Sequence, residues 1–228
     1  MNDLFSKYSL EARVFPTVLG LIPLFILQYL YIAGLLPIEL LAVLIIGNIT
    51  LSLIVLYALS EFVVRLISKV LEEKIFDARK NMPTTRMLLF GDSEYSREFK
   101  EKIRAKVNSD FGLTLPNEHE ELHDEKGSRI RIKEAVGLII KRVGSGSLVL
   151  QHNIAYGFAR NFYGASLVGV VFSVPLAILS YMNSDTAVTI LAVVLLVGYC
   201  IYLILGKRVI VFTGNLYARK LIEEYMSI

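Results

Sequence analysis

Two histidines and a glutamate near the middle of the chain have the most recognisable chemical spacing. His119, Glu120 and His123 form the pattern H-E-x-x-H, which on a helix places two imidazoles on one face beside a carboxylate. In zinc proteases this arrangement holds the metal and supplies the general base. Here acidic residues surround the motif from Glu118 to Glu125, whereas working examples lie among uncharged residues on a buried helix. A third ligand such as Glu134 would have to come from elsewhere. We therefore expect no metal, no cofactor and no catalytic residue.

Basic side chains are the second candidate chemistry. They concentrate on two expected amphipathic helices, one carrying Tyr95 to Val107 and ending at Gly112, the other running from about Ser128 to Val143. Backbone N–H groups of the loop from Gly144 to Ser147 could meet a phosphate, and nearby aromatic rings could stack on a base. The alternative is that these charges solvate helices beside anionic lipid headgroups. The residues expected to bind an anionic ligand are Arg129, Lys133, Lys141, Arg142, Tyr156, Arg160 and Asn161.

Four uncharged stretches must position these side chains relative to a membrane. They run from Val14 to Ile38, Leu40 to Ser60, Asn161 to Ser184 and Thr186 to Gly206, and each is long enough to cross about 30 Å of hydrocarbon as a helix. All 24 lysines and arginines lie before the first stretch, between the second and third, or after the fourth. The positive-inside rule therefore predicts a four-span inner-membrane protein with cytoplasmic termini and a cytoplasmic insert. The single cysteine, Cys200, allows no disulfide within one chain.

A possible pore-lining face follows the second stretch. Residues within about 60° of one another on this helix carry carboxylates at both ends and branched aliphatics between them. Such a face could attract cations at two mouths and close by dewetting. The alternative is that it packs against the chain's own first or fourth helix. The expected pore residues are Glu39, Val43, Ile46, Thr50, Ile54, Tyr57 and Glu61, and Val64 and Ser68 continue the same face.

Other residues inside the apolar stretches predict close helix packing. A ridge of small residues, Ala165, Gly169, Ser173 and Ala177, lets two helix backbones approach in lipid, with the partner left open between this chain and another copy. Asn48 is expected to contact a second subunit. Pro16 and Pro23 leave backbone carbonyls without N–H donors, and neighbouring helices are expected to supply replacements.

The expected organisation is all-α and has four parts. Residues 1–80 form the first transmembrane hairpin with a stalk, because the second helix is expected to continue to about Ala78. Residues 81–160 form the helical module, 161–206 the second hairpin, and 207–228 an amphipathic surface helix.

The order of elements resembles a known family. Leu115 to Leu122, followed by the run from Asn153 to Asn161 that leads into a span, resembles the membrane effectors of Hailong anti-phage defence systems. The resemblance implies a homotetrameric ion channel. It also implies that single-stranded oligodeoxyadenylate, made by a partner nucleotidyltransferase, keeps the channel closed.

We therefore expect a homo-oligomeric, most simply tetrameric, channel of the bacterial inner membrane that binds membrane lipid and is controlled by an anionic oligonucleotide. The alternative is a non-enzymatic membrane subunit that binds a protein partner through the insert.

Overall fold

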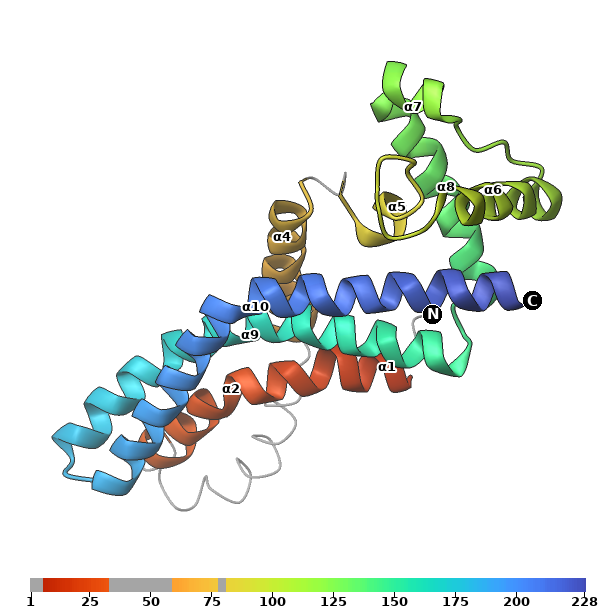
Figure 1. Ribbon diagram of the computed structural model, residues 1–228. Coiled ribbons are helices and arrows are strands. Elements are labelled where there is room, and N and C mark those ends of the chain that lie inside the picture. Colours follow the sequence, from red (N-terminus) through yellow and green to blue (C-terminus); the bar gives the residue numbers. More distant parts are fainter. Residues whose placement is uncertain (1–5, 33–58, 78–80) are drawn as a thin grey trace. The chain divides into compact units, whose positions relative to one another are not determined.

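The computed structural model describes residues 6–32, 59–77 and 81–228, and all regular secondary structure in these residues is helical. The expected all-α class is therefore confirmed for the described part of the chain. Labels beginning with η mark π-helical stretches. The elements in chain order (Figure 1) are α1 (Lys7–Ser9), η1 (Leu10–Val14), α2 (Phe15–Leu27), η2 (Gln28–Ile32), η4 (Leu59–Val64), α4 (Arg65–Ile75), α5 (Pro83–Arg86), α6 (Arg97–Phe111), α7 (Glu118–His123), α8 (Glu125–Val143), α9 (Ser147–Met182) and α10 (Thr186–Ser227).

Three helical segments among the described residues are long and apolar enough to cross a membrane. They run from Lys7 to Tyr31, from Ser147 to Met182 and from Thr186 to Ser227. The first, third and fourth expected spans overlap these segments. The expected second span, residues 40–60, lies outside the described residues apart from Leu59 and Ser60. Four spans and their orientation therefore stay predictions.

The chain divides into two compact units. One unit, here called the bundle unit, contains Met1–Leu71 and Gly157–Ile210, and the other, here called the module, contains Glu72–Tyr156 and Val211–Ile228. The boundaries between them fall inside α4, α9 and α10. This division differs from the expected one, in which 81–160 formed the module and 207–228 a separate surface helix. The last turns of α10 belong to the module because their apolar side chains complete its core.

Glycines bring the helices of the bundle unit close together. A Cβ atom added to Gly20 of α2 would lie 2.4 Å from the carbonyl oxygen of Ala165 on α9, and one added to Gly169 would lie 2.6 Å from the ring of Tyr199 on α10. The expected small-residue ridge on α9 therefore packs, at Ala165 and Gly169, against helices of the same chain. Only small residues permit such backbone approach in an apolar bundle.

The two prolines of α2 have the partners that the sequence predicts. Pro16 lacks the N–H that would bond the carbonyl of Ala12 four residues earlier, and the side-chain amide of Asn161 donates to that carbonyl at 2.6 Å. Pro23 likewise lacks the N–H for the carbonyl of Leu19, which accepts a 2.6 Å hydrogen bond from the Tyr199 hydroxyl. Neighbouring helices thus satisfy both carbonyls, and this prediction is confirmed.

Side-chain caps define the helices of the module. Ser96 accepts from the Phe99 N–H at the start of α6, and Gly112 ends that helix with a φ of 65°, which favours glycine. Asp124 follows α7 and caps α8 by accepting from the Gly127 N–H at 2.9 Å. This cap explains why α8 begins at Glu125 and not near Ser128 as expected.

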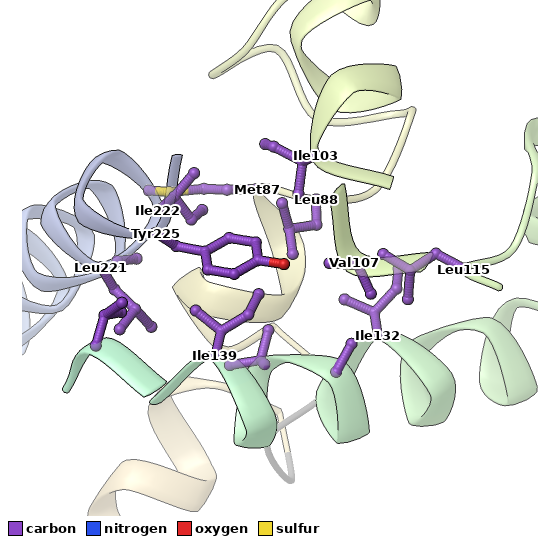
Figure 2. Close-up of a cluster of buried hydrophobic side chains, with 14 of the residues drawn as sticks. Met87, Leu88, Ile103, Val107, Leu115, Ile132, Ile139, Leu221, Ile222 and Tyr225 are labelled. Atoms are coloured by element: carbon purple, nitrogen blue, oxygen red, sulfur yellow. The ribbon is translucent and has the colours of Figure 1, made fainter. Parts of the chain in front are cut away.

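A continuous apolar core holds the module together. Figure 2 shows the ring of Tyr225 on α10 between Ile139 of α8 and Ile222, with Met87 beside Ile222, and Ile103 of α6 belongs to the same cluster. The Tyr225 hydroxyl donates to Asp110 at 3.0 Å. The prediction of a surface helix over 207–228 was therefore wrong, because Leu221, Ile222 and Tyr225 are buried.

Candidate functional site

The H-E-x-x-H run lies on the short helix α7, where its glutamates have structural roles. Glu120 completes a capping box with Asn117, accepting the Asn117 N–H at 2.8 Å, and that hydrogen bond is the main cause that lowers the pKa of Glu120. His119 and His123 are exposed and stacked, with ring centroids 3.9 Å apart. The described residues contain no group of three or more histidine, cysteine or acidic side chains that could hold a metal ion.

Replacing Glu120 by glutamine tests the structural role of this residue against a catalytic one. Glutamine also completes a capping box, so we expect α7 to remain folded and activity to be unchanged, whereas a zinc protease would lose its general base and nearly all turnover. Circular dichroism and the zinc content of the purified protein provide the measurement. Stoichiometric zinc that is lost in His119→Ala would contradict the prediction.

Two basic residues of α6 point into the module. Lys100 is only 1% exposed and donates to the carbonyl oxygens of Phe90 and Asp92. Arg104 pairs with Glu121 at 2.7 Å and lies over the ring of Phe90. Burial lowers the pKa of both cations. Neither Lys100 nor Arg104 is therefore available to an external anion.

One face of α8 carries two lysines of the expected site that are open to solvent. Lys133 and Lys141 are exposed on this face, and so is Lys126, which the sequence did not single out. At about 100° per residue the three lysines lie within roughly 80° of one another. Ile130 and Gly137 lie between them, and Glu134 lies at the edge of the face. We call Lys126, Lys133 and Lys141 the lysine face.

The spacing along α8 limits what could contact the whole lysine face. At about 1.5 Å of rise per residue, successive lysines are roughly 10–12 Å apart along the helix axis. One phosphate group cannot bridge such distances. A ligand that engages the three lysines must therefore be extended and carry several negative charges.

The other expected ligand residues do not join this face. Arg129 is paired with Glu125 at 2.8 Å, and Arg142 lies over Phe111 near Asp110. Tyr156 is buried in the module, so it cannot stack on an external base.

Arg160 and Asn161 belong to the bundle unit and not to the module. Asn161 is buried, and its side-chain amide N–H donates a hydrogen bond to the Ala12 carbonyl. Tyr156 and Asn161 are buried, and the Tyr156 hydroxyl and the Asn161 amide N–H donate to internal partners that the linear sequence does not reveal, so the expectation that they face a ligand does not match the structure.

The expected pore face lies largely outside the described residues, which include none of Glu39, Val43, Ile46, Thr50, Ile54 and Tyr57. Glu61 lies on η4, and its side chain is not described. The C-terminal end of the same face is described. Val64 and Ser68 are buried, and a Cβ atom added to Gly164 of α9 would lie 2.6 Å from the Ser68 hydroxyl. At this end the face packs within the bundle unit.

A buried glutamate that sequence reasoning missed lies on α4. Glu72 is 5% exposed, and its carboxylate accepts a hydrogen bond from the Tyr156 hydroxyl. The ring of Tyr156 stacks on Tyr217 of α10, with centroids 6.3 Å apart and planes 3° from parallel. Glu72 lies among charged neighbours in sequence, so no pattern marks it as buried.

Searches of protein-family models, curated proteins and solved structures find no match to this chain.

Proposed function

We propose that the protein is a homo-oligomeric ion channel of a bacterial inner membrane, held closed by an anionic oligonucleotide bound to the module. The lysine face of α8 is the observation that carries the proposal, because it lies on a folded module attached to helices that are apolar enough to cross a membrane. The length of the lysine face favours a polymeric ligand over a mononucleotide. The sequence resemblance to Hailong effectors leads to oligodeoxyadenylate as the first ligand to test and to a tetramer as the first assembly.

In this proposal the module is cytoplasmic and no chemical reaction takes place. The excess of basic residues outside the apolar stretches supports the orientation. A ring of subunits would place the expected pore residues around one axis.

A second candidate is a membrane subunit that binds a protein through the module. Exposed apolar side chains favour it, above all Leu122 of α7, which is 80% exposed, and Ile130 within the lysine face. Exposed apolar side chains can form the apolar core of a protein contact.

Ion flux from proteoliposomes separates the two candidates. We expect a deoxyadenylate oligomer to reduce flux and to bind with an affinity that falls with salt. Each phosphate contact to a single strand contributes about −0.7 to the log–log slope, so Lys133→Ala and Lys141→Ala should each flatten it by about that amount.

Lys102→Ala is the matched control, because Lys102 is exposed on α6, away from the lysine face. This variant should bind like the wild type. Absence of binding by deoxyadenylate and ribonucleotide oligomers at low salt would contradict the proposal and make protein binding the first candidate.

A further inference from the structure

A cluster of side chains in the module lies where the chain passes between the two units. Glu72 is the first module residue on α4, and Tyr156 is the last module residue on α9 before the boundary. Gly214 and Tyr217 follow the boundary on α10 within about two helical turns. Each of the three helices that the two units share thus contributes to this junction cluster.

The contacts inside the cluster are close and specific. The Tyr156 hydroxyl donates to the Glu72 carboxylate, and the Tyr156 ring stacks on Tyr217. A Cβ atom on Gly214 would lie 3.2 Å from the Tyr156 ring and 3.5 Å from the ring of Pro83, the first residue of α5. A change in the position of one of these helices therefore displaces side chains of the others.

The place of the Glu72–Tyr156 bond distinguishes it from the similar bond between Tyr225 and Asp110, because it joins α4 to α9 next to the boundary between the units. A buried carboxylate loses its hydration, so an apolar side chain of similar size often stabilises a protein as well or better. A hydrogen bond to a charged group is also directional, and it favours one arrangement of the helices over others. These properties suit an element that selects between two arrangements.

We propose that the Glu72–Tyr156 hydrogen bond transmits the ligand state of the module to the helix of residues 59–75, which leaves the expected second span. The inference rests on the proposed function and assigns its regulation to two positioning residues. Ligand on the lysine face favours the arrangement of α8 and α9 in which this bond is made. The bond in turn holds α4 in the arrangement that belongs to the closed channel.

Tyr156→Phe tests the inference in full-length protein reconstituted in liposomes, because it removes the hydroxyl and leaves the stacked ring. Flux is measured with and without a saturating deoxyadenylate oligomer. The oligomer must be saturating because the coupling between oligomer binding and channel closure is reciprocal. A variant that loses this coupling therefore also changes its apparent affinity for the oligomer. We expect the oligomer to bind while its effect on flux falls about tenfold or more, as the loss of one hydrogen bond to a charged group predicts.

Tyr225→Phe is the matched control. It removes another buried tyrosine–carboxylate bond of the module, to Asp110, away from the cluster. This variant should keep the wild-type flux response. Glu72→Gln is the second test variant, because an amide oxygen can still accept from Tyr156, and its response should lie between those of the wild type and Tyr156→Phe.

The outcomes separate the inference from the function on which it rests. Oligomer binding with lost flux response in Tyr156→Phe alone supports the inference. A wild-type response in Tyr156→Phe, or an equal loss in Tyr225→Phe, overturns it and leaves the channel in place. Wild-type flux that ignores a bound oligomer overturns the proposed function, and the inference with it. If Tyr156→Phe fails to fold, the response of Glu72→Gln decides, and a wild-type response overturns the inference.

Discussion

Arg104→Ala is expected to destabilise the module by about 3–5 kcal/mol, the range for breaking a buried ion pair by removing one partner. The Arg104 and Glu121 side chains are only 11% and 8% exposed, and their closest N–O distance is 2.7 Å. Removing the guanidinium leaves the carboxylate in a poorly hydrated site without its countercharge. Since whole domains are stable by only about 5–15 kcal/mol, this loss should be visible as partial or complete unfolding.

Hydrogen bonds from these two side chains to backbone groups add to the expected loss of stability. Arg104 also donates to the Leu88 carbonyl at 2.8 Å, and Glu121 accepts the Phe90 N–H at 2.7 Å. Replacing both partners by apolar side chains often restores stability when an ion pair stands alone. Here the double replacement Arg104→Met with Glu121→Leu should stay unstable, because the carbonyls of Leu88 and Pro116 and the N–H of Phe90 lose their partners.

Chemical denaturation followed by circular dichroism measures this prediction. Arg97→Ala is the control, because Arg97 pairs with Glu118 and Glu101 at the surface and its side chain is 66% exposed. Exposed pairs contribute about 1 kcal/mol or less. A loss in Arg104→Ala no larger than that in Arg97→Ala would contradict the structural role of the buried pair.

The helices of the module could be predicted because their signals are local. The apolar spacing of Ile103 and Val107 predicts the buried face of α6, and Gly112 predicts its end. The inward orientation of Lys100 was missed although it lies on the same face, seven residues before Val107. Its burial depends on the carbonyls of Phe90 and Asp92, which only the tertiary fold brings to it.

The lengths of α9 and α10 could not be predicted from hydropathy. Apolar composition predicts which residues suit lipid, and the charges at Lys207 and Arg208 were interpreted as the end of the last span. Helical hydrogen bonds are local and continue through such a boundary when no proline or cap interrupts them. α10 therefore continues to Ser227, and its end reaches a core that the sequence assigned to the middle segment alone.

Tyr199→Phe should destabilise the bundle unit by about 1–3 kcal/mol, the cost of leaving a buried polar group without its partner. The hydroxyl of Tyr199 bonds the Leu19 carbonyl, which Pro23 deprives of its helical donor. In an apolar bundle no water replaces that partner.

Pro23→Ala should rescue most of this loss, because alanine restores an N–H that can bond the Leu19 carbonyl. The double variant Pro23→Ala with Tyr199→Phe should therefore be less destabilised than the sum of the single changes, and a double-mutant cycle measures the difference. Unfolding in mixed micelles with increasing SDS, followed by circular dichroism, gives the four free energies.

Tyr202→Phe is the matched control on the same helix. Its hydroxyl donates to the Ala159 carbonyl at 2.9 Å, but the residue four positions later is Tyr163, whose N–H is available inside α9. Removing the Tyr202 hydroxyl therefore leaves no carbonyl without a hydrogen bond, and it should lower the free energy of unfolding less than Tyr199→Phe does. Equal costs, or strict additivity with Pro23→Ala, would mean that Tyr199 contributes through packing against Gly169 and not by replacing the proline's missing donor.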